Sequence, residues 1–209
     1  MKVYILDEIL KYENCKSILD DMFKEIEHKV SSSNLVFSHF IIDGFELYDD
    51  FYDYFLDNIR NIKEVEVITK TIKEISQDII MTTIDYYYRA IPEIEILANE
   101  FYKTTSRESW HKLMALVEGV KWIMDTFVAI DTNPQLQDIV RSYEGWNRYA
   151  KDVYSLQEIM LDFEDVLENS DFVSTADLLS YKIAPLFKEM KGKLEQLVLE
   201  EVAMDKVES

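Results

Sequence analysis

Glycine and proline are scarce in most of this chain. Between residues 71 and 205 the sequence is interrupted only by Gly119, Gly145, Gly192, Pro92, Pro134 and Pro185. These two residue types mark turns and break helices, and apolar residues recur between them at spacings of three and four. This region is therefore expected to consist of long helices.

The chain is strongly acidic. Its 209 residues include 41 acidic and 22 basic residues, which gives a formal net charge of -19. The basic residues do not cluster, so we expect neither nucleic acid nor an anionic membrane surface as a partner. Such a charge keeps a protein soluble, and it also fits a basic protein partner. The sequence leaves both interpretations open.

The cysteine content and the N-terminus indicate the compartment. Cys15 is the only cysteine, so no intramolecular disulfide can form. The opening run MKVYILDEIL reaches Asp7 and Glu8 too early for the apolar core of a signal peptide. No apolar run approaches the length of a membrane-spanning helix. We therefore expect a soluble, cytoplasmic protein.

Residues 1–70 combine strand and helix patterns. We predict strands at 2–6 and 9–12, a helix at 15–30 and a pair of strands within 35–48. A short helix at 49–56 and a last strand at 64–71 follow. The paired strands are joined by Asp43-Gly44, which suits the positive φ angles of a type I′ hairpin turn. Asp49 or Asp50 is the expected N-cap of the short helix.

This order of elements resembles the ubiquitin-like β-grasp superfold, with residues 1–70 as the match. The resemblance is one of topology and carries no catalytic residue. Members of that superfold serve as recognition modules or tags, as sulfur carriers or as iron–sulfur proteins. A carrier needs a C-terminal Gly-Gly, which the exit at Lys70-Thr71 lacks, and a cluster needs four cysteines. The resemblance therefore implies a role in recognition.

The helical part is expected to span residues 71–205, with residues 206–209 as a frayed tail. Helices are predicted after Thr71, from about 105 to 130, from 134 to 168 and from 174 to 202. Pro92 either kinks the first helix or begins a new one, and Pro185 should bend the last. We expect an α+β protein, with the β-grasp module followed by an antiparallel four- or five-helix bundle.

Three caps and one buried stripe can be assigned within these helices. Thr105 with Glu108 forms a capping-box pattern, Asn133 precedes Pro134 as a cap, and Ser174 with Asp177 suggests another start. The helix after Thr105 is expected to bury one stripe of apolar residues: Trp110, Leu113, Val117, Val120, Met124 and Phe127.

No motif for catalysis or for metal binding can be assigned. Glu25 with His28, and Glu108 with His111, have the Glu-x-x-His spacing of di-iron bundles. The first pair, however, lies in the predicted β-grasp helix, outside the bundle that such a site requires. His39 falls in a strand, where a half-buried histidine is expected more often than a catalytic base. We predict no catalytic residue, no metal ligand and no cofactor.

Aromatic residues are the stronger indication of function. Phe45, Tyr48, Phe51, Tyr52, Tyr54 and Phe55 are interspersed with aspartates, and Tyr86-Tyr87-Tyr88 must point in three directions from one helix. These residues could seal the junction between the two parts of the chain. Otherwise they form a recognition surface. As candidates for that surface we take Tyr48, Phe51, Tyr52, Tyr54, Tyr86 and Tyr88.

The sequence therefore favours an acidic protein–protein interaction module, an adaptor or chaperone-like binder. Its partner is unknown, and a basic protein would suit its charge. Two alternatives stay open. One is an enzyme or carboxylate-ligated metalloprotein whose site is assembled from distant residues. The other is an acidic mimic of nucleic acid, which a one-sided array of carboxylates would favour. The oligomeric state is left open.

Overall fold

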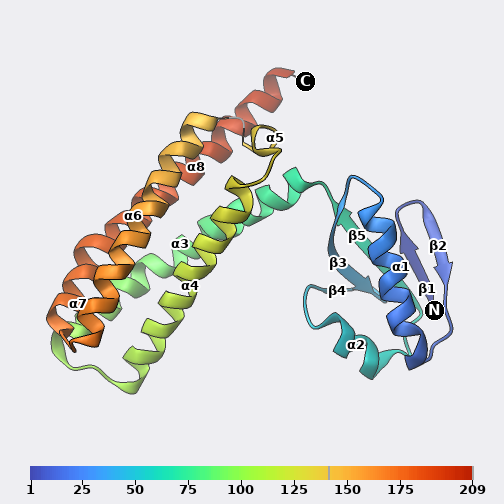
Figure 1. Ribbon diagram of the computed structural model, residues 1–209, viewed down its shortest axis with the longest axis horizontal. Helices are drawn as coiled ribbons and strands as arrows, with labels where there is room; N and C mark the ends of the chain where they lie inside the picture. The colour runs from blue at the N-terminus through green and yellow to red at the C-terminus, as the bar shows by residue number, and fades with distance from the viewer. Residues whose placement is uncertain (141, 209) are drawn as a thin grey trace. The chain divides into compact units, whose positions relative to one another are not determined.

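The computed structural model describes the backbone of residues 1–140 and 142–208, and the side chains of 1–140 and 142–199. Its internal contacts divide the chain into two compact units, Met1–Ile75 and the remainder from Ser76 onward. The first unit is a sheet with helices, and the second is helical (Figure 1). The structure is thus α+β, with a mixed sheet at the N-terminus.

The sheet of the first unit has five strands in the order β2-β1-β5-β3-β4. The strands are β1 (Lys2–Ile5), β2 (Glu8–Lys11), β3 (Val36–Ile42), β4 (Phe45–Leu47) and β5 (Glu64–Lys70). The central pair β1 and β5 is parallel, and the other pairs are antiparallel. The predicted order of strands and helices in this unit is confirmed.

One helix covers one face of the sheet. The helix α1 (Leu19–Ser31) follows a short 3-10 turn and buries Leu19, Met22, Ile26 and Val30, which lie three or four residues apart. From the sheet, Val3, Ile5, Val65 and Val67 are buried in the same core. Burying one such side chain contributes about 1.5–3 kcal/mol, so this face dominates the stability of the unit.

The hairpin between β3 and β4 turns at Asp43 and Gly44, whose φ angles are 48° and 88°. The predicted type I′ geometry is confirmed, because both turn residues have positive φ. The Asp43 carboxylate also accepts hydrogen bonds from the backbone N–H groups of Lys63 and Glu64, at 3.1 and 2.8 Å. Asp43 therefore anchors the start of β5 as well as the turn.

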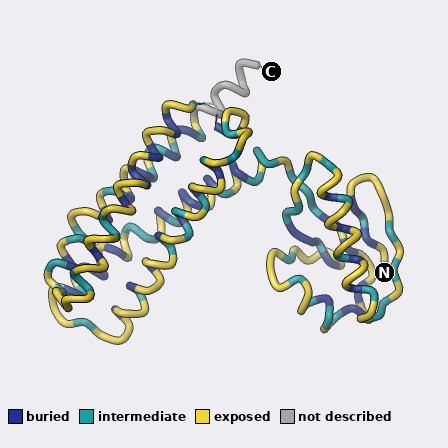
Figure 2. The backbone as a smooth tube through the Cα atoms, viewed as in Figure 1, coloured by how far each residue is buried: buried dark blue, intermediate teal, exposed yellow. Residues whose placement is uncertain are grey.

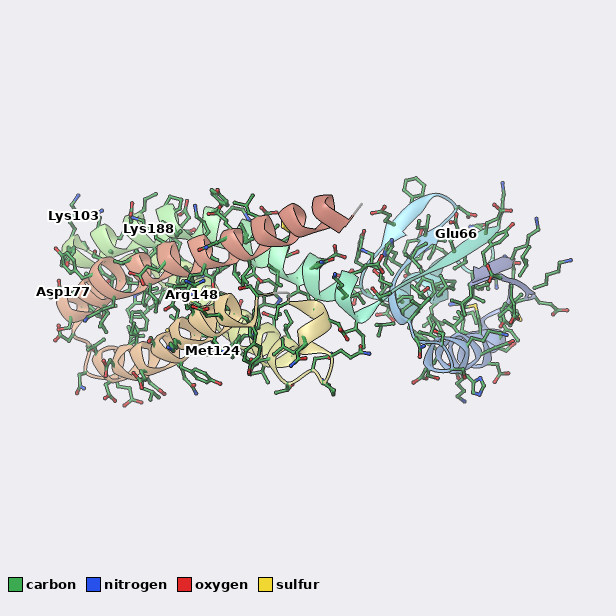
Figure 3. All side chains as sticks on the ribbon, turned by 90° about the horizontal axis from the view of Figure 1, so that it is seen from above. Glu66, Lys103, Met124, Arg148, Asp177 and Lys188 are labelled. Carbon is green, nitrogen blue, oxygen red and sulfur yellow. The ribbon has the colours of Figure 1, made fainter. Side chains whose placement is uncertain are left out.

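The long helices of the second unit lie alongside one another (Figure 1). They are α3 (Ile72–Lys103), α4 (Arg107–Asp131), α6 (Tyr143–Glu168) and α8 (Ala184–Glu208), with the short α5 (Leu136–Ile139) and α7 (Phe172–Leu178) between them. Their buried residues follow one side of each helix (Figure 2). Lys188 of α8, labelled in Figure 3, forms an ion pair with Glu95 of α3 at 2.6 Å, which places these two helices side by side.

Three predicted helix caps are wrong. The capping box of α4 uses Ser106 and Ser109, one residue after the predicted pair. The helix predicted from residue 134 with Asn133 as its cap is divided: α5 has Gln135 as its N-cap and ends at Ile139, and α6 begins at Tyr143 with the Ser142 hydroxyl as its cap. The cap of α7 is Asp171, whose carboxylate accepts from the Ser174 backbone N–H at 3.0 Å. For α4 and α7, a nearby short polar side chain was an equally good cap by sequence.

The buried stripe of α4 is also displaced from the prediction. Leu113, Val120 and Phe127 are buried as expected, but Trp110 is 37% exposed and Val117 is 39% exposed. Leu116, Ile123 and Ile130 are buried in their place. Both stripes have the same helical spacing, and the packing of the neighbouring helices selects between them.

The two prolines inside helices are accommodated differently. α3 is one helix that contains Pro92, so Pro92 does not begin a new helix. Pro185 follows a π-helical turn at Leu179–Ile183. The ring of Pro185 would meet the carbonyl group of Tyr181 in a regular α-helix, and the wider π turn moves that carbonyl group. α8 extends to Glu208, into the tail predicted to fray, and Ser209 lies outside the described residues.

Candidate functional site

The aromatic residues of the first unit form a cluster between α1, β3 and α2 (Phe51–Asn58). The Phe40 ring contacts those of Phe37, Phe51 and Phe55, at centroid distances of 4.7, 5.2 and 5.6 Å. Phe51 and Tyr54, two of the predicted surface residues, are only half-buried and pack against this core. These two side chains therefore contribute to folding as well as to the surface.

An irregularity in β3 brings two of these rings to the same face. The pairing of β3 with β5 shifts its register between Phe37 and His39. In a regular strand, residues three apart point to opposite faces of the sheet. The extra residue puts Phe37 and Phe40 on the same face, where both contact Phe51. This bulge was not evident from the sequence.

A groove of about 470 Å³ opens beside this cluster. It is lined by α1, the following loop, β3 and the first residue of α2, and its side chains include Phe23, Val30, Val36, Phe37, Phe51 and Glu27. Val36 is 38% exposed, and the Phe23, Phe37 and Phe51 rings are half-buried. Only Phe51 among these residues belongs to the surface predicted from sequence. The others were missed because each fits a strand or helix core.

Two further predicted residues are exposed in this unit. The Tyr48 ring is 61% exposed and stacks on the ring of His39 at 4.5 Å. Tyr52 is 45% exposed, and its hydroxyl donates to the Asp20 carboxylate at 3.1 Å. That bond raises the pKa of Tyr52, because the phenolate would face the negative carboxylate. Tyr52 therefore joins the start of α2 to the start of α1.

His39 itself is buried, at 6% exposure. Its Nδ1 lies 3.0 Å from the Ser38 hydroxyl, and the Tyr48 ring covers one face of the imidazole. These contacts are typical of a structural histidine, although His39 is more buried than the half-buried residue expected from the sequence. Its ring is shielded from solvent, and the partner of Nδ1 is a hydroxyl group, not the carboxylate that would orient a catalytic base.

Tyr86, Tyr87 and Tyr88 of α3 point in three directions. Tyr87 is fully buried, and its hydroxyl lies 3.1 Å from that of Tyr149. Burial is the main cause that raises the pKa of Tyr87 well above its usual value, and the nearby Tyr149 hydroxyl is the second cause. Tyr88 is 56% exposed; its hydroxyl donates to Glu195, and Lys191 Nζ lies 3.8 Å from its ring centroid. Tyr88 is therefore exposed but held against α8.

Tyr86 lines a smaller pocket, of about 250 Å³, between α3 and α4. Its walls are apolar, with Ile94, Leu97 and Leu116, and its charged groups are Arg89, Glu93 and Lys112. Lys112 is paired with the Glu100 carboxylate at 2.7 Å. Hydrogen bonds from Lys112 and then Ser109 lower the pKa of Glu100. Because Lys112 is paired with Glu100 and Glu93 also lines the pocket, its charges do not favour an anion.

The two Glu-x-x-His pairs are exposed and lie in different units. His28 is on α1 and His111 is on α4, and both are exposed. Among the described side chains, no group of three or more His, Cys, Asp or Glu residues is placed to hold a metal ion. None of the helices within the described residues combines the length and the apolar character that a membrane crossing requires.

Comparison with known families divides the chain at a similar place. Residues 1–71 are similar to a family described as the TP0873 N-terminal domain. Residues 78–193 match the family described as a domain of unknown function, DUF8042, and this match covers more than half of the chain. The chain therefore belongs to the DUF8042 family. No curated protein and no solved structure matches it.

Proposed function

We propose that this chain is a non-catalytic protein–protein interaction module, an acidic adaptor or chaperone-like binder, and that its first unit contacts the partner. The groove between α1 and β3 carries this proposal. It is an apolar hollow of about 470 Å³ in a chain with a net charge of -19. An exposed apolar groove on a highly charged protein is typical of a site that contacts another protein or a ligand.

Other exposed aromatic residues of the first unit support a protein partner. Phe45 and Tyr52 are 74% and 45% exposed, and the carboxylates of Glu46 and Asp53 follow them in the sequence. Interfaces commonly combine aromatic residues at the centre with a polar rim that controls encounter and specificity. We propose that Tyr48, Phe51, Tyr52 and Tyr54 belong to this surface. Tyr86 and Tyr88 are candidates for a contact of the helical unit.

We also propose a β-grasp fold for the first unit and an antiparallel helix bundle for the second. The strand order β2-β1-β5-β3-β4, with a parallel central pair crossed by α1, supports a β-grasp fold for the first unit. Contacts of α6 with α8 and with α4, and the ion pairs that tie α3 to α4 and α8, support an antiparallel bundle. The acidic charge and the free Cys15 support a cytoplasmic location.

The proposal is tested by affinity capture of the tagged full-length chain from its native cell, followed by mass spectrometry. Val36→Glu places a carboxylate at the mouth of the groove. Ile9→Glu makes the same change at an exposed β-branched residue on β2 of the same sheet, outside the groove. We expect Val36→Glu to reduce capture of the partner at least tenfold and Ile9→Glu to leave it unchanged.

Two results would overturn the proposal. One is that no protein is captured reproducibly by the wild-type chain. The other is that the captured proteins are retained equally by wild type and Val36→Glu, provided that circular dichroism shows both variants to be folded.

A further inference from the structure

We propose that the partner binds as an extended segment that adds to the open edge of β3, with an apolar side chain in the groove and basic side chains beside it. This inference rests on the proposed function and specifies the chemistry of its partner. It is carried by three separate observations, on the sheet edge, on the groove and on the charges along α1.

The first observation is that part of β3 has a strand on one side only. β5 pairs with β3 from Val36 to Ile42, whereas β4 pairs only with Phe40–Ile42. Tyr48, just after β4, stacks on His39, and among the described strands none pairs with Val36–Ser38 on the side opposite β5. A strand edge presents a row of backbone N–H and C=O groups that an extended peptide can pair with. The open edge therefore selects an extended segment over a helix.

The second observation is that this edge adjoins the groove. Val36 and Phe37 belong to the uncovered part of β3, and both line the groove together with Phe23 and Phe51. A segment that pairs with β3 presents alternate side chains to one face of the sheet. On the face of α1, one such side chain would meet this aromatic hollow. An aliphatic or aromatic residue fits there, because the lining is almost wholly apolar.

The third observation is the sign of the charge along α1. Glu27 lines the groove, and Asp20 lies seven residues before it, which is about two helical turns. Both residues are therefore on the side of α1 that carries Phe23. Lys24 is about 100° from Phe23 around the helix. It is only about 40° from Asp20 and about 60° from Glu27, so one lysine faces two carboxylates on this side of α1. Lysine or arginine beside the apolar anchor would complement Asp20 and Glu27.

The test begins with a random twelve-residue peptide library displayed on phage and selected against the full-length chain. We expect the enriched peptides to carry a large apolar residue flanked by lysine or arginine, and to lack proline at the anchor. The best peptide is then synthesised with N-methyl groups on either its odd or its even backbone amides. In an added strand only alternate amides point at β3, so one set should weaken binding at least tenfold and the other only slightly.

A charge reversal examines the basic flank. Glu27→Lys should weaken binding of the selected peptide about fivefold at low salt and less at high salt. The matched control is Asp21→Lys, an exposed acidic residue on the opposite side of the same helix, which should leave the affinity unchanged. Amide signals of Val36–His39 in the ¹⁵N-labelled chain should shift when the unmodified peptide is added.

The outcomes separate this inference from the proposed function. If Val36→Glu abolishes partner capture but both N-methylated peptides bind alike, the groove binds a partner in another form and the strand addition is wrong. If the shifts lie outside β3 and α1, or follow self-association of the chain, the inference is overturned while a binding role survives. If no peptide is enriched and no partner is captured, both are overturned.

Discussion

The hydroxyl of Tyr86 lies directly against the backbone of Gly119, so a Cβ atom at Gly119 would stand 1.8 Å from that oxygen. α3 and α4 can approach this closely only because residue 119 has no side chain. The same contact holds the Tyr86 ring at the edge of the pocket between these helices. Tyr86 was chosen as a candidate surface residue because it begins a run of three tyrosines, and its position depends on a glycine 33 residues later in the sequence.

The first prediction concerns Gly119→Ala. An alanine in a helix is normally more stable than a glycine by about 0.5–1 kcal/mol. Here the methyl group must displace the Tyr86 ring, and we expect a loss of about 1–3 kcal/mol in the free energy of unfolding. Urea unfolding followed by tryptophan fluorescence measures the helical unit, which contains Trp110, Trp122 and Trp146.

Gly192→Ala is the matched control, because nothing lies within 4 Å of a Cβ placed there. It should stabilise the unit by about 0.5–1 kcal/mol. In a Tyr86→Ala background, Gly119→Ala should also become stabilising. If Gly119→Ala and Gly192→Ala change the stability alike, the close contact with Tyr86 is not present in solution.

The second prediction concerns the ion pair of Lys193 with Asp152, which joins α8 to α6 at 2.5 Å. Asp152 is 8% exposed, so its charge would lose most of its compensation in Lys193→Met. We expect a loss of about 1–3 kcal/mol, between the usual costs for exposed and for fully buried pairs. Adding Asp152→Asn should restore much of this stability, because the remaining buried charge is removed.

Lys188→Met provides the comparison, because its partner Glu95 and Lys188 itself are more than half exposed. We expect this change to lower the free energy of unfolding by less than about 1 kcal/mol. Chemical denaturation of the wild type and these three variants, in one buffer, gives the differences directly. Equal losses for Lys193→Met and Lys188→Met would contradict the assignment of a buried pair at Asp152.

The third prediction concerns Tyr102, whose hydroxyl donates to the Asp177 carboxylate (Asp177 is labelled in Figure 3). This hydrogen bond is the main cause that raises the pKa of Tyr102 to about 12. Because the folded pKa lies above the usual value near 10, the contact stabilises the fold below pH 10. That contribution is lost as the pH rises from about 10 to about 12.

NMR titration of ¹³C-labelled tyrosine can follow this ionisation, with Tyr102→Phe used to assign the signal. In Asp177→Asn the midpoint for Tyr102 should move down toward the usual value, since the carboxylate charge is removed. A midpoint that is the same in wild type and Asp177→Asn would show that Asp177 does not control this phenol.

Much of the first unit could be predicted from sequence because its signals are local. The Asp43-Gly44 pair specifies a turn within two residues, and each strand alternates over a few positions. The bulge between Phe37 and His39 could not be predicted, since it depends on how β3 pairs with β5, a strand more than 20 residues later. The groove was missed for the same reason, because it exists only once Phe37 and Phe40 share a face.

In the helical unit the sequence defined where helices occur better than it defined their ends and buried faces. Trp110 and Val117 fit a buried stripe, but so do Leu116 and Ile123, and only the neighbouring helices decide between them. Thr105 and Ser106 are both good caps, as are several residues between Asp131 and Ser142. Where two local choices are nearly equal in free energy, tertiary packing selects one of them.

The fourth prediction returns to the hairpin of the first unit. Asp43→Ala with Gly44→Ala places two alanines at positive φ and removes the acceptor for the Lys63 and Glu64 N–H groups, so we expect a loss of about 2–4 kcal/mol. Asp43→Asn is the control, because Asn-Gly also suits this turn. Hydrogen exchange of β3 and β5 amides should accelerate in the double variant alone, while tryptophan fluorescence of the helical unit stays unchanged. Loss of both units together would instead indicate that they unfold as one.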